Sequence, residues 1–285
     1  MNPLSHLPEE KQKEILAAVE IIKEEANPEK IILFGSHATG KWVDSSYVED
    51  GIKLSYISDY DLLVVLSDDN KQEEGEIISH IENRCNDFHG IVSPIAHTIS
   101  YINHGLSFGQ FFFMRIIDEG ISLYDTGNTE FVKPKILTPE EQKKKAQDYF
   151  DLWFPRGQGF LKGAHFYLGI NDYRLSAFSL HQAAENFYGT VLLVFSGYKP
   201  SIHGLQKMRN YSKHLSDELY SLFLTPPEDG HEYHLFDLLK RGYIEARYKP
   251  NYNINREECE ELIDKLTKME EIVDRICMGK IKSFK

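Results

Sequence analysis

The chain has 285 residues, of which 41% are hydrophobic and 27% charged, a composition typical of a globular protein long enough for two domains. Its formal net charge of −12 disfavours a general nucleic-acid coat protein, which would need a basic face. No apolar run reaches about 18 residues and the first residues are polar, so we expect neither a transmembrane helix nor a signal peptide.

The three cysteines are Cys85, Cys259 and Cys277. They are odd in number, lie far apart and show no CxxC spacing. This pattern favours a reduced, cytoplasmic compartment over a disulfide framework.

The first part of the chain predicts an α/β or α+β domain over residues 1–125. An amphipathic helix over 8–26 precedes the buried strand "KIILFG", which ends at Gly35-Ser36. The further elements expected in chain order are a hairpin at 43–57 with a turn at Asp50-Gly51, the strand "SDYDLLVVL", a polar helix at 71–86, a strand at 91–99, a helix at 102–120 and a strand at 121–125.

The rest of the chain predicts an all-helical bundle over residues 138–285, after a linker at 126–137. Thr138 and Glu141 form a capping box around Pro139, which marks a sharp helix start. A core helix is expected at 174–196, because its apolar residues repeat with the helical period. Further helices are expected at 203–223, 233–247 and 255–278.

Asp59 and Asp61 are two residues apart beside the apolar run that follows them, so in a strand their side chains lie on one face. Two like charges at such a place repel each other, and a divalent metal removes that cost. Mg²⁺ prefers oxygen ligands and is commonly held by one or two carboxylates together with substrate phosphates. The pair therefore predicts a Mg²⁺ site.

Gly35-Ser36, at the end of a predicted strand, is a candidate phosphate site. A glycine lets backbone N–H groups approach phosphate oxygens closely, and the serine hydroxyl adds a donor. A turn and a solvated strand end are the structural alternatives for this pair and for the Asp-x-Asp pair. Their occurrence in one domain favours a joint role in nucleotide binding.

The Gly-Ser pair followed by "SDYDLLVV" resembles the DNA polymerase β-type nucleotidyltransferases, in particular their minimal bacterial members. The resemblance implies a mixed-sheet domain that transfers a nucleoside monophosphate to a hydroxyl. It implies that Asp59 and Asp61 bind Mg²⁺ and that Gly35 and Ser36 bind the phosphates of the nucleotide.

Two features depart from that family. The gap between Ser36 and Asp59 is long, which the expected hairpin explains as an insertion. The third carboxylate of the family is absent from the strand at 91–99, where His97 is the best candidate for that position, as a base near neutral pH. A core histidine is the structural alternative.

The stretches "YRLSAFSLHQAAENFY", "GYKPSIHGL" and "YIEARYKPNYNI" resemble the HEPN family of helical bundles. A nucleotidyltransferase followed by such a bundle is the layout of kanamycin-type nucleotidyltransferases, which work as dimers with substrate between the domains. That layout makes Glu185 a candidate base for the acceptor hydroxyl, with a role in holding the bundle together as the alternative. Arg247 and Tyr248 form a candidate nucleotide-contact patch by charge and stacking, with a helix end closed by a tyrosine side chain as the alternative.

Some HEPN proteins are ribonucleases with an Arg-x(4–6)-His motif, which Arg209 and His214 fit. Two other Arg–His pairs in the chain fit it as well, and Ser216 replaces the tyrosine that paired systems modify. His231 and His234 lack the HExxH zinc pattern and indicate a polar helix start.

The function expected from these patterns is Mg²⁺-dependent transfer of AMP, or another monophosphate, from an NTP such as ATP to a small-molecule or protein hydroxyl. A homodimer without membrane contact is expected, and RNA is a possible but less favoured partner. The alternatives are a degenerate nucleotide-binding sensor or antitoxin-like module and a HEPN ribonuclease regulated by the fused domain.

Overall fold

The computed structural model describes residues 3–49, 52–200, 204–223 and 230–285, and for residues 44–57 it describes the backbone alone. By their internal contacts the residues form two compact units, Met1–Ile136 and Leu137–Lys285. None of the helices in the described part of the chain is long and apolar enough to cross a membrane.

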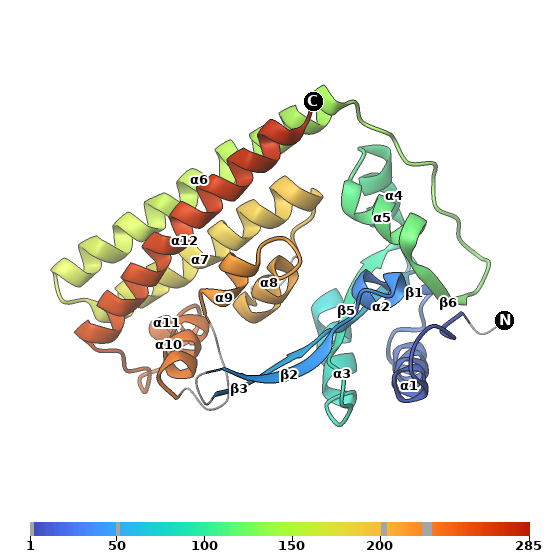
Figure 1. Ribbon diagram of the computed structural model, residues 1–285, viewed down its shortest axis with the longest axis horizontal. Coiled ribbons are helices and arrows are strands. Elements are labelled where there is room, and N and C mark those ends of the chain that lie inside the picture. Colours follow the sequence, from blue (N-terminus) through green and yellow to red (C-terminus); the bar gives the residue numbers. More distant parts are fainter. Residues whose placement is uncertain (1–2, 50–51, 201–203, 224–229) are drawn as a thin grey trace. The chain divides into compact units, whose positions relative to one another are not determined.

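The first unit contains a sheet and several helices (Figure 1). Its elements in chain order are α1 (Glu9–Ala26), β1 (Lys30–Phe34), α2 (Gly35–Thr39), β2 (Asp44–Glu49), β3 (Ile52–Ile57), β4 (Tyr60–Leu66), α3 (Glu74–Arg84), β5 (Val92–Thr98), α4 (Ile99–Ser107), α5 (Phe111–Glu119) and β6 (Ile121–Asp125). The four-stranded sheet has the order β5-β4-β1-β6, and β2 pairs with β3 in a separate hairpin. Strands β4 and β5 are parallel and the other neighbours are antiparallel, so the predicted mixed sheet is confirmed.

Strand β4 is buried along its whole length, as its unbroken apolar run predicts. On one face of the sheet, the Tyr60 hydroxyl donates to Glu14 of α1 at 2.7 Å. On the other face, His97 of β5 contacts the ring of Phe113 of α5, with 5.9 Å between centroids. Helices therefore cover both faces of the sheet.

One prediction for the end of this unit needs correction. The single helix expected at 102–120 is two helices, because Gly109 adopts a left-handed conformation with φ +66° and breaks the run. The segment expected to be a linker stays with the first unit as far as Ile136. The side chain of Asn103 donates to the carbonyl of Glu130 at 3.1 Å and accepts from the N–H of Val132 at 2.9 Å.

The second unit shows helices throughout its described residues and no strand. Its elements are α6 (Pro139–Gly169), α7 (Tyr173–Ser196), α8 (Leu205–Ser212), α9 (Asp217–Ser221), α10 (Gly230–Arg241), α11 (Glu245–Tyr248) and α12 (Arg256–Ser283). The predicted capping box at the start of α6 is confirmed, since the Thr138 hydroxyl accepts from Glu141 N and the Glu141 carboxylate accepts from Thr138 N. The α+β class predicted for the whole chain is also confirmed.

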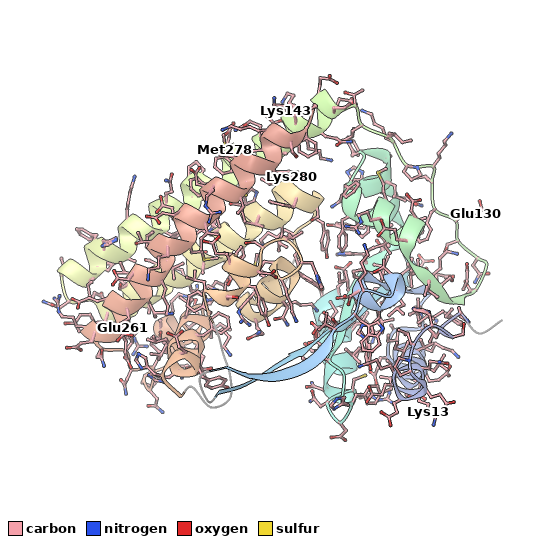
Figure 2. All side chains as sticks on the ribbon, viewed as in Figure 1. Lys13, Glu130, Lys143, Glu261, Met278 and Lys280 are labelled. Carbon is pink, nitrogen blue, oxygen red and sulfur yellow. The ribbon has the colours of Figure 1, made fainter. Side chains whose placement is uncertain are left out.

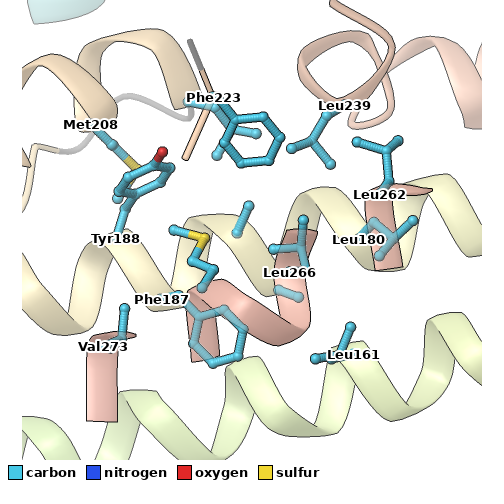
Figure 3. Close-up of a cluster of buried hydrophobic side chains, with 14 of the residues drawn as sticks. Leu161, Leu180, Phe187, Tyr188, Met208, Phe223, Leu239, Leu262, Leu266 and Val273 are labelled. Carbon is cyan, nitrogen blue, oxygen red and sulfur yellow. The ribbon is translucent and has the colours of Figure 1, made fainter. Parts of the chain in front are cut away.

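Helix α7 forms the centre of the bundle and packs against α6 and α12. Figure 3 shows Phe187 of α7 within an apolar cluster that includes Leu161 of α6 and Leu266 of α12. Charged side chains such as Glu261, which is labelled in Figure 2, are exposed on α12. This division between an apolar and a charged face is the helical periodicity that the sequence shows.

Two helices expected in this unit are each divided in two. The helix expected at 203–223 is α8 and α9, and Ser216 caps α9 by accepting from the N–H of Leu219. The helix expected at 233–247 is α10 and α11. Between them lies Gly242, where a Cβ would stand 2.9 Å from the Ala177 carbonyl oxygen, so the glycine permits a close approach to α7.

Candidate functional site

The β1–β4 pairing brings the two halves of the sequence motif together. In the antiparallel register, Phe34 pairs with Asp61, and Gly35 follows directly. Gly35 has φ +72°, and a Cβ at this position would lie 3.2 Å from Asp61 Cγ and would overlap its Oδ2. The Asp61 carboxyl, which is 8% exposed, therefore occupies the space that only a glycine leaves open.

Ser36 has a buried hydroxyl, with 7% of the residue exposed. Its Oγ has no hydrogen-bond partner within the described part of the chain. Burying a hydroxyl without a partner costs free energy, so such a group is usually satisfied by water or a ligand. The orphan hydroxyl follows the glycine that contacts Asp61, which is where a phosphate oxygen was predicted to bind.

Asp59 lies directly before β4 and is partly buried. Its main-chain carbonyl accepts a hydrogen bond of 3.0 Å from Nδ1 of His37 in α2. His37 is fully buried, with its ring stacked on Trp42 at 5.9 Å and edge-on to Tyr60 at 4.7 Å. His37 thus fixes the Gly-Ser segment to the Asp59 backbone, a role that the sequence analysis missed. The sequence feature that could have indicated this role is the histidine directly after the Gly-Ser pair.

The predicted inserted hairpin is present as β2 and β3, and its Asp50-Gly51 turn lies outside the described residues. Its base is closed where the N–H of Ser58 donates to the carbonyl of Val43 at 2.9 Å. The N–H of Val43 donates in return to Ser58 Oγ, also at 2.9 Å. Because the hairpin closes on itself, Asp59 remains next to the Gly-Ser segment despite the long gap in sequence.

The structure does not bring His97 to the aspartates. In the parallel β4–β5 pair, Ser93 lies opposite Asp61, and His97 lies opposite Val65. Four strand positions correspond to about 13 Å. His97 is 3% exposed, with Nδ1 3.1 Å from a Glu74 carboxylate oxygen. The side chain opposite Asp61 is therefore a serine hydroxyl, not an acid or an imidazole.

The donor set fits Mg²⁺, which usually keeps several water ligands and takes one or two protein carboxylates. Asp59 and Asp61 would supply the carboxylates, and the orphan Ser36 hydroxyl would be a donor to a phosphate beside them. Among the described residues, no group of three or more His, Cys, Asp and Glu side chains could hold a metal. A metal here would depend on two aspartates and on oxygens from the substrate.

The predicted base Glu185 lies on α7 in the second unit and is 5% exposed. Lys199 Nζ stands 3.4 Å from one of its carboxylate oxygens, and His181 Nε2 stands 3.9 Å from the other. His181 in turn donates from Nδ1 to the carbonyl of Leu239 at 2.9 Å. Glu185 is thus surrounded by groups of its own bundle.

Arg247 and Tyr248 lie on α11 and are exposed. The Arg247 guanidinium stands 4.5 Å from the ring of Tyr243 and 4.9 Å from the rings of Phe178 and Tyr248. The two predicted contact residues are therefore adjacent in a cation–aromatic cluster, at which a nucleobase could stack.

Arg209 and His214 differ in exposure. Arg209, on α8, is 3% exposed, and its guanidinium lies 4.0 Å from the ring of Tyr220. His214 follows α8 and is exposed. His231 and His234, which the sequence analysis assigned to a polar helix start, hydrogen-bond to Glu261 and Glu258 and so join α10 to α12.

Comparison with protein-family models finds a match in the helical part of the chain. Residues 150–276 match the model of the HEPN domain. The match lies within the second unit and confirms the HEPN interpretation of the helical region. A search of curated proteins found no match. The function of the first unit must therefore be inferred from the geometry of its own residues.

Proposed function

We propose that the first unit transfers a nucleoside monophosphate, most simply AMP from ATP, to a hydroxyl acceptor. The observation that carries this proposal is the contact of the Asp61 carboxyl with Gly35, beside the orphan hydroxyl of Ser36. This arrangement combines a carboxylate for a divalent cation with a hydroxyl donor for phosphate. It is also the arrangement that the resemblance to polymerase β-type nucleotidyltransferases implies.

In the proposed reaction, the acceptor oxygen attacks the α-phosphorus of the nucleotide. A new P–O bond forms, the bond to the β-phosphate breaks, and pyrophosphate leaves with the electron pair. Bound Mg²⁺ would supply charge screening for the triphosphate. Asp59 and Asp61 would hold the metal, Ser36 would donate to a phosphate oxygen, and His37 would keep the Asp59 backbone in position.

The proposal assigns no proton transfer to Glu185. That carboxylate is buried among Lys199 and His181 of its own unit. An acceptor hydroxyl would have to displace these contacts to reach it. The proton of the acceptor hydroxyl passes to solvent water in the proposed reaction.

The test incubates the full chain with Mg²⁺, an α-labelled NTP and a panel of hydroxyl acceptors, and measures labelled product. Asp61→Asn should lower transfer by about a hundredfold or more, because metal stabilisation of the transition-state charge is worth several kcal/mol. Asp69→Asn is the matched control, since Asp69 is exposed beyond the other end of β4 and should leave transfer unchanged. Equal transfer by the parent and Asp61→Asn would exclude the proposal.

A nucleotide sensor without transfer is the second candidate function, and the position opposite Asp61 favours it. That position is Ser93 rather than an acid. On this hypothesis a non-hydrolysable ATP analogue binds in an Asp61-dependent way, but no acceptor is labelled. Ser93→Asp separates the two functions. It should raise transfer if a third carboxylate limits a working enzyme, whereas a pure sensor should remain inactive.

A further inference from the structure

The face of the sheet that carries Asp61 is also the face that α5 covers. Phe34 and Asp61 are cross-strand partners in the β1–β4 pair, so their side chains lie on one face of the sheet. Val65 lies on the same face, because alternate residues of a strand share a face, and His97 is its partner on β5. The ring of His97 contacts Phe113 of α5, with 5.9 Å between centroids. Helix α5 therefore packs on the side of the sheet where the candidate site lies.

Phe34 and Phe112 form an aromatic pair next to Asp61. Their ring centroids are 5.8 Å apart and the rings are nearly perpendicular, at 85°. Both side chains are partly exposed, whereas Phe113, the next residue of α5, is fully buried. Phe113 thus closes the core, and the aromatic pair keeps ring surface that a ligand can reach.

The exposed parts of these two rings suit a flat aromatic ligand. Stacking of a nucleobase on an aromatic side chain raises affinity by about fivefold to a hundredfold. Helix α5 also contacts α2, which begins at Gly35 and carries Ser36, so the aromatic pair lies beside the segment proposed to bind phosphate. A molecule with phosphates at one end and an aromatic ring system at the other matches both parts, and a nucleotide has this form.

We propose that Phe34 and Phe112 bind the base of the nucleotide by stacking and that they select purines. This inference rests on the proposed function, since the phosphates of the same nucleotide bind at Ser36. The two fused rings of a purine cover more of an aromatic side chain than the single ring of a pyrimidine does. Phenylalanine offers no hydrogen bond to the base edge, so adenine and guanine bind alike. The donor substrate is therefore a purine nucleoside triphosphate, ATP or GTP, rather than ATP alone.

The test is isothermal titration of the full chain, with Mg²⁺ present, using α,β-methylene analogues of ATP, GTP, CTP and UTP, which cannot release pyrophosphate. The ATP and GTP analogues should have Kd values within about threefold of each other. The CTP and UTP analogues should bind about fivefold to tenfold more weakly. Inorganic tripolyphosphate in a further arm measures the phosphate site without any base.

Phe112→Leu removes one ring of the pair and keeps an apolar side chain against the fold. It should weaken both purine analogues about fivefold or more and leave tripolyphosphate binding unchanged. Phe112→Tyr keeps the ring and should bind as the parent does. Phe108→Leu is the control, because Phe108 is 62% exposed at the end of α4 and should not affect any ligand. Phe34→Leu tests the other ring if Phe112→Leu fails to fold.

The outcomes separate this inference from the function on which it rests. Tripolyphosphate binding together with purine binding that neither leucine variant weakens would overturn the stacking site and leave the proposed function standing. If neither tripolyphosphate nor any analogue bound, the proposed function would fall, and this inference with it. Pyrimidine analogues that bind as tightly as purine analogues would overturn the selection of purines. A change in the KM of the acceptor alone in Phe112→Leu would assign the ring to the acceptor instead.

Discussion

In the helical unit, Arg174 of α7 donates to four main-chain carbonyls of the segment 245–250, whereas in the first unit the buried Ser36 hydroxyl has no described partner. The arginine fixes α11 to α7, and main-chain carbonyls accept hydrogen bonds from its guanidinium group. The serine lies in α2, whose described residues give its hydroxyl no hydrogen-bond partner. The contrast separates a side chain whose hydrogen bonds the fold satisfies from a buried hydroxyl that the described residues leave without a partner.

The largest effect is expected from the apolar core of the helical unit. Phe187→Ala should lower the free energy of unfolding by about 3–5 kcal/mol, because it leaves a cavity beside Phe154 and Gly157. Denaturant titration followed by circular dichroism measures it. Phe166→Ala, at a position 63% exposed, should change stability by less than about 0.5 kcal/mol. Similar losses for the two variants would contradict the assignment of this core.

Gly35→Ala tests the close contact at the candidate site. The substitution should cost about 2–4 kcal/mol, from the left-handed backbone and the overlap with Asp61, and should abolish nucleotide binding. Gly40→Ala is closely matched, because Gly40 has φ +74° but no atom within 4 Å of the point where a Cβ would stand. The control should lose only about 1–2 kcal/mol and keep binding. Equal binding in the two variants would show that Asp61 and Gly35 do not form a nucleotide site.

The third prediction concerns Glu14, a carboxylate of the first unit that accepts hydrogen bonds from other residues of that unit. Burial acts to raise its pKa, but hydrogen bonds from Tyr60, His89 and Gly90 outweigh it, and the pKa falls below the ordinary value of 4.5. A lowered folded-state pKa gives stability that is present above that value and lost as pH falls below it. Glu14→Gln should therefore cost about 1–2 kcal/mol at pH 7 and flatten the acid limb of the stability curve.

The pH titration of thermal unfolding measures the effect of Glu14→Gln. Glu10→Gln, at an exposed position in the same helix, should reproduce the parent curve. If the melting temperatures of Glu14→Gln and the parent fell in parallel between pH 7 and pH 3, the link between Glu14 protonation and stability would be refuted.

Ser36→Ala should have the smallest effect on stability, within about 0.5 kcal/mol of the parent, because it removes a hydroxyl that the fold does not use. Affinity for an ATP analogue should nevertheless fall about fivefold to tenfold. Ser176→Ala gives the reverse pattern, since its buried hydroxyl donates to the Ala164 carbonyl at 3.0 Å. It should cost about 1 kcal/mol and leave nucleotide affinity unchanged. Stability loss without affinity loss in Ser36→Ala would assign that hydroxyl to the fold.

The sequence predicted the elements that depend on local pattern. The capping box at Thr138, the apolar strand β4 and the alternation of strands and helices up to Asp125 are all present. The contact between Gly35 and Asp61 needed the β1–β4 register, which no local pattern specifies. The position of His97 needed the register of a parallel pair, and the residue opposite Asp61 is Ser93.

Other features depend on contacts between distant residues. The helix expected at 102–120 ends early because Gly109 takes a left-handed conformation, although glycine alone does not compel a break. The burial of Arg209 depends on Tyr220 and Phe236, which lie on later helices. Its sequence motif could not reveal that the side chain faces inward.

The reciprocal hydrogen bonds between Val43 and Ser58 have a consequence for how this protein can change. They make the hairpin a self-contained loop, with both of its ends anchored beside the candidate site. Additions or deletions beyond that anchor would leave the aspartates where they are, so this stretch can diverge or be rebuilt while the chemistry next to it is preserved. For an engineer, it is an insertion point for a reporter peptide close to the candidate site.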